Sequence, residues 1–496
     1  MCPCFNKETF MDTKKLMTLL PDHSAESSLF VSTRDRGGKT RYKWDVVLER
    51  GLSSDFGLFM PARLPFFTEA AINKLSNLTY SEMAWVIMRS FLPQEDISHK
   101  VLADICDGAY SETHIPLEKA IDDNNLVIAR LDRGPSCSFK DFAARFLARL
   151  MSHYLSVNKR EATIIVATSG DTGTAIQTAF HGLPNTRVLV LYPSDGVSEI
   201  QEKQMLSVKG NVSAVPVSGN FDACQQLAKN LLNDDKVRNR FNLTSANSIS
   251  LWRLLPQTVY YFFIWASLNK IFPGQNMIFA VPSGNLGNLT AGLIAKRMGL
   301  PLKVFIAGTN ANNIFANIVG KGTASGSLSN KLTLANSMDI SVPSNLERIL
   351  FLYGESPVNI PDILLEKRSI NPTVVENLRR DVFGEDIITN EDIEAHIVRF
   401  WRRNNIVLEP HGVIGVAASF RYRQYFSEDR SIITVLETAS PAKFPDFQKN
   451  YPDIPIPQCP SVKRLAGIDL KTIRPEKVPA EAGAIIRKLE LLTSGN

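Results

Sequence analysis

A lysine that stands between small hydroxyl residues and an apolar helical repeat is the first candidate for chemistry in this chain. Lys140 follows Ser136 and Ser138, and apolar side chains recur after it at spacings of three and four residues, which predicts an amphipathic helix. Asp141 then falls in the first helical turn, where a carboxylate suits the helix dipole. A lysine held at such a junction and partly buried has a lowered pKa and can form a Schiff base. A solvated lysine at a helix start is the simpler interpretation of these residues alone.

Two turns that contain glycines and follow strand-like runs are the next candidates. Residues 168–173 (Thr-Ser-Gly-Asp-Thr-Gly) follow one apolar run, and residues 283–288 (Ser-Gly-Asn-Leu-Gly-Asn) follow another. Hydroxyl groups and backbone N–H groups at the start of a helix bind carboxylates and phosphates. The second turn lacks the Gly-Lys-Ser/Thr ending of a Walker motif and does not match GxGxxG, so it predicts a phosphate cup without a fixed cation. Each turn taken alone is also compatible with an ordinary strand–helix connection.

The segments that position these residues alternate between strand-like and helical patterns. Strand-like runs cover 163–167, 187–191, 212–217, 277–281, 303–307 and 431–437. Such alternation predicts an α/β fold of open, mostly parallel sheets with helices on both faces. Ligands of such sheets bind beyond the carboxyl ends of the strands, so we expect Lys140 and both turns to meet in one cleft. A lysine, a phosphate cup and a carboxylate-binding loop are what a pyridoxal-phosphate enzyme acting on an amino acid requires.

Four regions are predicted along the 496 residues. They are a flexible leader (1–25), an N-terminal lobe (26–128), a catalytic region (129–445) with an insertion near 310–404, and a C-terminal tail (446–496) that packs on the core. The segment 247–270 is predicted to be one long helix with a kink at Pro256. Its apolar part is too short to span a bilayer, and residues 1–25 lack the apolar core of a signal peptide.

The charge balance and the cysteines argue against several classes of protein. Lysine and arginine total 55 against 50 acidic residues, a net charge of +5, with no basic run of the kind that binds nucleic acid. Six cysteines are scattered without metal-ligand spacing: Cys2, Cys4, Cys106, Cys137, Cys224 and Cys459. They predict free thiols in a reducing compartment and no bound metal. We therefore expect a cytoplasmic monomer or homodimer that binds neither nucleic acid nor membrane.

Several motifs, taken together, resemble threonine synthase of the longer kind found in fungi and many bacteria. The segments that carry the resemblance are Ser138–Asp141, Thr168–Gly173, Ser245–Gln257, Pro282–Asn288, Ser337–Arg348 and Thr438–Phe444. The resemblance runs from about residue 29 to about residue 445. It implies a fold-type-II enzyme that uses pyridoxal 5′-phosphate and a phosphorylated amino acid. The implied reaction converts O-phospho-L-homoserine and water to L-threonine and phosphate.

The same resemblance assigns roles to individual residues. Lys140 would be the Schiff-base lysine and the catalytic group, and Thr438 would face the pyridine nitrogen of the cofactor. The cofactor phosphate would be held by Gly284, Asn285, Leu286, Gly287 and Asn288. Asp171 would lie near the cofactor, and the substrate carboxylate would be received by Thr168, Ser169, Gly170 and Thr172. Candidates for stabilising the leaving phosphate are Arg253, Ser245, Asn247 and Ser248, with Arg133 as a substitute for a histidine of the family.

The sequence also departs from the family pattern at several positions. Arg133 and Ser440 each stand where the family has histidine, Glu409 replaces an aspartate, Ala335-Asn336 replaces Ser-Pro, and Phe56 replaces a glycine. Several of these changes fall around expected substrate contacts, whereas the cofactor motifs are intact. Two alternatives to threonine synthesis therefore stay open. One is a phospho-lyase or γ-replacement enzyme on a related amino acid, and the other is a non-catalytic relative that binds the cofactor.

Overall fold

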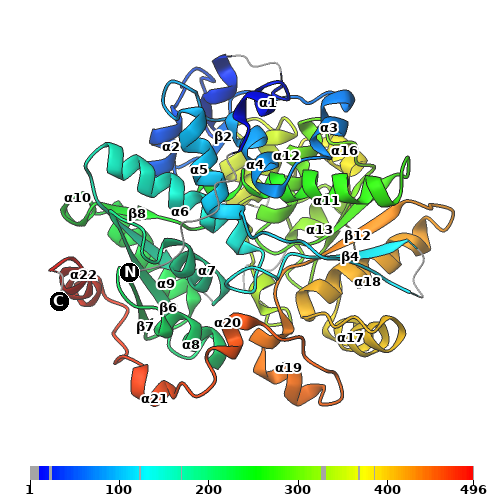
Figure 1. Ribbon diagram of the computed structural model, residues 1–496. Coiled ribbons are helices and arrows are strands. Elements are labelled where there is room, and N and C mark those ends of the chain that lie inside the picture. Colours follow the sequence, from blue (N-terminus) through cyan, green and yellow to red (C-terminus); the bar gives the residue numbers. More distant parts are fainter. Residues whose placement is uncertain are drawn as a thin grey trace.

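Two sheets form the frame of the fold in the computed structural model (Figure 1). The structure describes residues 11–494 except 22–24, 122–124, 169, 326–330, 367–368 and 385. The larger sheet has the order β11 (Val382–Phe383), β10 (Phe305–Gly308), β9 (Met277–Pro282), β12 (Ile432–Glu437), β4 (Leu126–Arg130) and β3 (Leu117–Lys119). The smaller has the order β7 (Val212–Val217), β6 (Thr186–Pro193), β5 (Ala162–Ala167) and β8 (Leu243–Ser245). Within these two sheets every neighbouring pair of strands is parallel except β3 with β4, and a separate two-stranded sheet pairs β1 (Phe30–Ser32) with β2 (Phe59–Pro61) antiparallel. The predicted open, mostly parallel α/β fold is therefore confirmed.

Helices cover both faces of each sheet. α18 (Pro410–Tyr425) packs on one face of the larger sheet, and α12 (Gly287–Arg297) with α11 (Gln257–Ile271) lies on the other. Successive residues of β9 divide accordingly, because side chains alternate across a strand: Ile278 packs in the core with α18, and Phe279 packs in the core with α12. The smaller sheet has α9 (Phe221–Asn233) on one face, and α6 (Lys140–Val157) and α7 (Asp171–Phe180) on the other.

The N-terminal lobe, at the top of Figure 1, shares one continuous core with the rest of the chain. It consists of η1 (Ala25–Ser28), β1 (Phe30–Ser32), α2 (Trp44–Arg50), β2 (Phe59–Pro61), α3 (Glu69–Leu75), α4 (Tyr80–Arg89) and α5 (His99–Tyr110). α4 packs on α11, and α5 packs on α6. Arg34 Nη2 also pairs with Glu347 Oε2 at 2.7 Å. The expected boundary between residues 128 and 129 falls inside β4, so the fold has no break there.

The expected leader and insertion both contribute structure. Residues 13–17 form α1 (Thr13–Met17), whose Leu16 is buried in the core of the lobe. The region 310–404 contains α13 (Ile314–Lys321), η3 (Asn336–Met338), α14 (Leu346–Leu352), α15 (Ile360–Glu366), α16 (Pro372–Asp381) and α17 (Asn390–Asn404). It also supplies the edge strand β11, which pairs with β10. The insertion therefore extends the larger sheet as well as covering it.

The tail crosses from the larger sheet to the smaller one. It contains α19 (Pro445–Asn450), α20 (Pro460–Lys463), α21 (Leu470–Ile473) and α22 (Ala482–Ser494). Val478 bridges to Val217 in parallel, which extends the edge of the smaller sheet. Ile485 and Leu489 of α22 are fully buried with side chains of α9. Figure 1 shows the tail running in orange and red beneath the molecule to α22.

Two expectations from the sequence are wrong in part. The segment 247–270 is not one kinked helix: a turn of 3₁₀ helix, η2 (Leu251–Arg253), precedes α11, and Pro256 is the N-cap of α11. Proline has no backbone N–H, so it fits the start of a helix better than its interior. The cysteines are not all free thiols either, because Cys137 and Cys459 form a disulfide. Cys106 and Cys224 are free and buried, and Cys2 and Cys4 lie outside the described residues.

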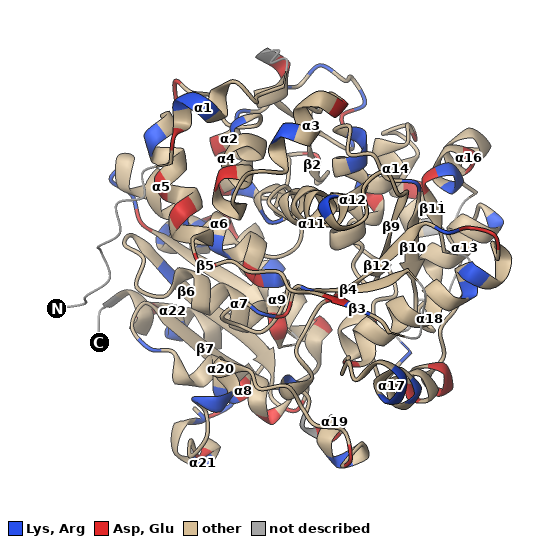
Figure 2. Ribbon diagram, turned by 45° about the vertical axis from the view of Figure 1, so that its right-hand side comes forward, with Lys and Arg blue, Asp and Glu red and all other residues tan. Residues whose placement is uncertain are grey.

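The distribution of charge, the apolarity of the helices and the grouping of metal-ligating side chains concern possible binding partners of the protein. Figure 2 shows acidic and basic residues interleaved over the helices on the view drawn. Within the described ranges, no helix has both the length and the apolarity needed to cross a membrane. The same residues contain no cluster of three histidine, cysteine or acidic side chains arranged to hold a metal ion.

Candidate active site

The ends of three neighbouring strands bring the main candidate residues together. Strand β12 pairs with β4 on one side and with β9 on the other, all in parallel. Lys140 follows β4, Thr438 follows β12 directly, and the glycine-rich turn follows β9. Their carboxyl ends lie along one sheet edge, which is where α/β folds bind ligands. The N–H of Phe139 donates to Thr438 O at 2.9 Å, so the segment before Lys140 is attached to the end of β12.

Lys140 is the first residue of α6, as the apolar spacing after it predicts. Its Nζ lies 3.6 Å from Asp171 Oδ2, and Lys443 Nζ lies 2.5 Å from Asp171 Oδ1. One carboxylate therefore serves two ammonium groups. Burial lowers the pKa of Lys140, and Lys443 and Arg253 lower it further, although Asp171 acts in the opposite direction. A lysine with a lowered pKa is more readily the free amine that attacks a carbonyl.

Asp171 connects the smaller sheet to this lysine pair. It begins α7, directly after β5, where a carboxylate is favoured by the helix dipole. Burial alone would raise the pKa of Asp171, but Lys443 and Lys140 hold it well below its usual range. Gln201 Nε2 also donates to Asp171 Oδ1 at 3.0 Å. Asp171 is therefore a buried, ionised anchor for the two ammonium groups.

The hydroxyl-rich turn before Asp171 is stabilised by its own side chains. Thr168 Oγ1 accepts hydrogen bonds from the N–H groups of Gly170 and Gly173, each at 2.9 Å. Gly170 has a φ of +133°, and a Cβ there would lie 2.3 Å from Gln201 Oε1. Thr168 thus shapes the turn, and Thr172 is half-buried beside it. Ser169, also expected to receive the substrate carboxylate, lies outside the described residues.

The glycine-rich turn opens α12 in a shape suited to a phosphate. Leu286 is in the left-handed region, with φ +58°. The first hydrogen bond of the helix runs from Thr290 N–H to Leu286 O at 2.8 Å, so the N–H groups of Gly287 and Asn288 precede it and are free of helical partners. Asn285 braces the turn: its Oδ1 accepts from Ser344 N–H at 2.6 Å, and its Nδ2 donates to Ser248 Oγ at 2.5 Å.

The two glycines of this turn differ in what surrounds them. A Cβ at Gly284 would lie 2.8 Å from the Met338 Cα, a backbone atom, whereas a Cβ at Gly287 would approach only Asn345 Nδ2, at 3.4 Å. Neither glycine has a positive φ; the strained residue is Leu286. The left-handed backbone of this turn is therefore at Leu286 and not at Gly287. Gly287 instead leaves open space beside free N–H groups.

We expect Gly287→Ala to weaken phosphate binding without destabilising the protein. Alanine is a good residue for a helical first turn, so the free energy of unfolding of the cofactor-free protein should change by less than about 0.5 kcal/mol. The added methyl group would occupy the space beside the free N–H groups, where a phosphate oxygen would be received. Equilibrium titration with pyridoxal phosphate should show an affinity at least about tenfold lower, a loss of about 1.4 kcal/mol.

Gly284→Ala is the matched control for this prediction. Its Cβ collides with the Met338 backbone, so it should lower the free energy of unfolding even without cofactor. An unchanged cofactor affinity in Gly287→Ala would contradict the proposed phosphate cup.

A buried arginine lies near Lys140 without a carboxylate partner in the described part of the chain. Arg253 is 5% exposed, its Nη1 donates to Ala246 O at 2.8 Å, and its Nε has no partner. Burial lowers the pKa of Arg253 to about 10, which still leaves it charged at neutral pH. Asn247 Oδ1 is also buried and unpaired, while Ser245 Oγ accepts from Asn247 N–H at 3.3 Å. A buried cation of this kind is suited to an anionic ligand.

Thr438 is backed by two buried carboxyl groups. Its hydroxyl donates to Glu409 Oε1 at 3.5 Å, and Glu437 Oε1 accepts from Glu409 N–H at 3.0 Å. Burial, and then the charge of Glu409, raises the pKa of Glu437 well above its usual range. Glu409 also caps α18 and holds the ring of His411, whose Nε2 accepts from Ser337 N–H at 3.1 Å. His411 is thus a buried structural residue.

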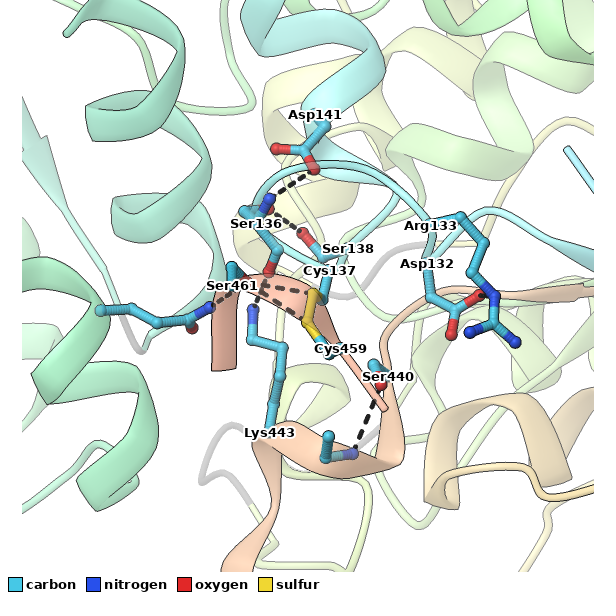
Figure 3. Close-up of a disulfide and its surroundings, with 12 residues drawn as sticks. Asp132, Arg133, Ser136, Cys137, Ser138, Asp141, Ser440, Lys443, Cys459 and Ser461 are labelled. Atoms are coloured by element: carbon cyan, nitrogen blue, oxygen red, sulfur yellow. Dashed lines mark hydrogen bonds and ion pairs between the residues drawn. A yellow bond between two sulfur atoms is a disulfide. The ribbon is translucent and has the colours of Figure 1, made fainter. Parts of the chain in front are cut away.

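Arg133 is oriented away from the lysine pair. It lies 3.6 Å from Asp132 and 3.8 Å from Glu118. Figure 3 shows it with Asp132 on the side of the loop away from Lys443. Ser440, which also replaces a histidine, accepts Ala442 N–H with its hydroxyl at 3.4 Å and donates its own N–H to Cys137 O at 3.0 Å. Neither replacement contacts Lys140 in this structure.

The contacts of Lys443, Gln201 and Glu437 were not predicted from the sequence. Lys443 lies in the Thr438–Phe444 segment, but its neighbours in the sequence do not indicate a contact with Asp171. Gln201 is recognisable as the partner of Ser198 in a capping box, which the structure confirms, but its bond to Asp171 is additional. Glu437 was predicted only as the last residue of a strand, and its contact with Glu409 was not. These contacts are long-range, so local spacing carries no signal for them.

The residues present suit pyridoxal phosphate. The cofactor requires an amine, an anion-binding cup and a hydrogen-bond partner for its ring nitrogen. Lys140, the turn before α12 and the Thr438 hydroxyl provide these groups at adjacent strand ends. Three buried polar atoms near the ends of β8 and β9 lack partners in the described residues, and they are Asn247 Oδ1, Arg253 Nε and Asn288 Nδ2. Buried polar atoms are rarely left unsatisfied, so their number here indicates a polar ligand.

Comparison with protein families agrees with this assignment. A family described as threonine synthase N terminus matches residues 29–110, and one described as pyridoxal-phosphate dependent enzyme matches residues 112–358. The second match contains Lys140, Asp171 and the turn before α12. The fold and the site therefore define a pyridoxal-phosphate-dependent enzyme of fold type II.

Individual proteins narrow the class further. A threonine synthase from Schizosaccharomyces pombe is 33% identical over 452 residues, which is 84% of this chain and 87% of that protein. The crystal structure of threonine synthase from yeast has a TM-score of 0.87 at 27% identity, covering 95% of this chain and all of that one (100%). A pyridoxal-phosphate-bound threonine synthase from Brucella melitensis has a TM-score of 0.81 at 32% identity, covering 94% and 99%. The chain belongs to the threonine synthase family.

Proposed function

We propose that this chain converts O-phospho-L-homoserine and water to L-threonine and phosphate with the help of pyridoxal 5′-phosphate. The observation that carries the proposal is the buried cluster in which Lys140 and Lys443 share Asp171 while Arg253 has no acidic partner in the described residues. The cluster combines an amine of lowered pKa with an unpaired cation suited to a phosphate. Membership of the threonine synthase family supports the same reaction.

Lys140 is the group that moves protons in this proposal. Bound pyridoxal phosphate supplies an electron sink that makes the Cα–H of an amino acid acidic. Lys140 would remove the proton at Cα and transfer protons at Cβ, because its amine has a lowered pKa and lies at the strand ends where the cofactor would be held. Asp171 keeps the lysine oriented, and Lys443 lowers the proton affinity of Lys140 through charge repulsion. The Thr438 hydroxyl, which donates to Glu409 Oε1, would be the hydrogen-bond partner of the ring nitrogen.

The phosphate that leaves Cγ requires stabilisation of its negative charge. Arg253 is the proposed cation, since its buried guanidinium has a free Nε and no acidic partner within the described residues. Ser245 is the last residue of β8, and Asn247 and Ser248 follow it in the chain, so these three side chains are further candidates for binding the leaving phosphate. Thr172 and the N–H groups at the start of α7 are proposed to receive the substrate carboxylate. Arg133 is left out of this set because it pairs with Asp132 and Glu118.

Product analysis tests the proposal. Purified protein saturated with pyridoxal phosphate should release phosphate and L-threonine from O-phospho-L-homoserine in equal amounts. Threonine forms only if water adds at Cβ after phosphate leaves. Phosphate accompanied by 2-oxobutyrate would favour the phospho-lyase, and failure to release phosphate would exclude both reactions for this substrate.

Arg253→Met should lower kcat/KM for O-phospho-L-homoserine by about 10²-fold or more, because it removes the cation proposed to stabilise the leaving phosphate.

A cytoplasmic location and a monomeric or homodimeric state belong to the same proposal. The location rests on the sequence, because residues 1–25 lack the apolar core of a signal peptide and the apolar stretch within 247–270 is too short to span a bilayer. A reducible disulfide such as Cys137–Cys459 is compatible with a cytoplasmic protein when the bond is transient. Cell fractionation and analytical ultracentrifugation distinguish the alternatives.

A further inference from the structure

A disulfide links the loop that presents Lys140 to the C-terminal tail. Cys137 lies in residues 131–139, here called the Lys140 loop, and Cys459 lies in residues 455–469, here called the tail segment. The two cysteines are separated by 322 positions, and their Cα atoms are 6.6 Å apart, within the range that a disulfide spans. Figure 3 shows the bond between the loop and the start of α20. No step of the proposed reaction uses either sulfur.

Apart from the disulfide, the tail segment is attached at a few points: Leu465 is buried, Ile456 packs against the core of the larger sheet, and α20 contacts α8 (Glu199–Ser207). α20 has no buried residue, and Gln458 and Pro460 on either side of Cys459 are exposed. Ser461 Oγ lies 3.1 Å from Cys137 Sγ and 3.2 Å from Cys459 Sγ, and it accepts from Gln204 Nε2 at 3.2 Å. Cys459 itself is 5% exposed and forms the centre of this contact. The disulfide is thus a main anchor of the segment.

The Lys140 loop has attachments of its own on both sides of Cys137. Lys443 Nζ donates to Ser136 O at 2.9 Å, and Cys137 O accepts Ser440 N–H at 3.0 Å. Phe139 N–H donates to Thr438 O at 2.9 Å. These bonds hold the loop against the end of β12 whether or not the sulfur atoms are joined. Breaking the disulfide should therefore release the tail segment and leave Lys140 in place.

We propose that Cys137–Cys459 is a redox modification site at which a dithiol reductant releases the tail segment from the Lys140 loop. A thiolate of the reductant attacks Cys459 Sγ, on the side of the exposed residues, and the Cys137 thiolate leaves. The second thiol of the reductant then attacks the mixed disulfide and frees Cys459. The reductant loses two electrons and becomes a disulfide, while the two cysteines gain two electrons and two protons.

The tail segment also lines a cavity of about 250 Å³ behind the loop. Pro460, Ser461 and Arg464 of the segment line it together with Arg133, Arg145, Glu112 and Asp141. Release of the segment would remove this part of the lining and widen access to the rear of the Lys140 loop.

Thiol counting and hydrogen exchange on the full chain test the proposal. Native protein is treated with or without dithiothreitol and then alkylated with N-ethylmaleimide. Reduction should add two adducts, at Cys137 and Cys459, and should raise amide exchange in residues 455–469 by about tenfold, with little change in residues 131–145. Equal adduct numbers with and without reductant would refute the disulfide. Two new adducts with unchanged exchange would refute the release.

Two variants separate the disulfide from its surroundings. Cys459→Ser should show fast exchange in the tail segment without reductant and no further change on reduction. Ser461→Ala removes the hydroxyl that contacts both sulfur atoms but keeps the disulfide, so its exchange should still respond to dithiothreitol. A response in Cys459→Ser, or none in Ser461→Ala, would contradict the assignment. These readouts do not depend on catalysis, so they stand apart from the proposed function.

Discussion

Lys140→Ala is expected to abolish turnover of O-phospho-L-homoserine while preserving the fold. The substitution removes the amine that holds the cofactor and moves protons, and the loss of kcat should be about 10³-fold or more. The fold should persist because Asp171 keeps its partner Lys443, whose Nζ lies 2.5 Å away. The ionised carboxylate is therefore not left alone in the interior. Phosphate release, circular dichroism and thermal unfolding measure the two effects separately.

A covalent readout identifies the lysine directly. Borohydride treatment of the cofactor-loaded protein should attach the pyridoxyl group to Lys140, and peptide mass mapping locates it. Lys140→Ala should give no labelled peptide. Lys229→Ala, on the exposed side of α9, is a matched control that should retain labelling and activity. Labelling of another lysine in the native protein, or parental turnover in Lys140→Ala, would overturn the assignment.

Most strands and helices that position this site were predictable, because local patterns of apolar residues and glycines indicate them. Apolar runs separated by helices predicted strands β5, β6, β7, β9, β10 and β12 to within about two residues at each end. The spacing after Lys140 predicted α6, and the glycine-rich turn was expected at the start of a helix, where α12 begins. Strand β4 was missed because it precedes the regular alternation of strand-like and helical segments, which begins after Lys140.

What could not be predicted are contacts between distant residues. Lys443 meets Ser136 across 307 positions, and Cys459 meets Cys137 across 322. Spacing rules describe neighbours on one helix or strand, so they contain no information about such pairs. The chemistry of Thr438 depends in the same way on Glu409, which reaches it from a different element. Nor did the sequence indicate that Leu286, and not a glycine, adopts the positive φ in the phosphate turn.

Asp171→Asn is expected to have the largest effect on stability among single substitutions in the site. Asparagine keeps the size of the side chain and its contact with Gln201, but it removes the carboxylate that pairs with both Lys140 and Lys443. Breaking a buried pair in this way costs about 3–5 kcal/mol of unfolding free energy. The pKa of Lys140 should also fall further, because the attraction of Asp171 for its proton is lost. Denaturant unfolding of the cofactor-free protein at neutral pH measures the first effect.

The pH dependence of this loss has a definite sign. Asp171 has a lowered pKa in the folded protein, so its stabilising contribution is present above the unfolded pKa of about 3.9 and is lost as the pH falls through the folded value. The free energy difference between the native protein and Asp171→Asn should therefore shrink in acid. In alkaline solution the variant should regain stability as Lys140, whose pKa is lowered in the folded protein, loses its proton and one uncompensated charge is removed. The difference is thus largest near neutral pH.

A control variant and the reactivity of Lys140 provide two checks on the role of Asp171. Asp195→Asn makes the same chemical change at an exposed carboxylate, and it should alter unfolding free energy by less than about 0.5 kcal/mol at every pH. The reaction of Lys140 with an amine-specific reagent in cofactor-free protein should show a midpoint at lower pH in Asp171→Asn than in the native protein. If Asp171→Asn instead raised that midpoint, or lost no more stability than Asp195→Asn, Asp171 would not be the counterion of the two lysines. The shared carboxylate would then no longer explain how two ammonium groups are buried at one site.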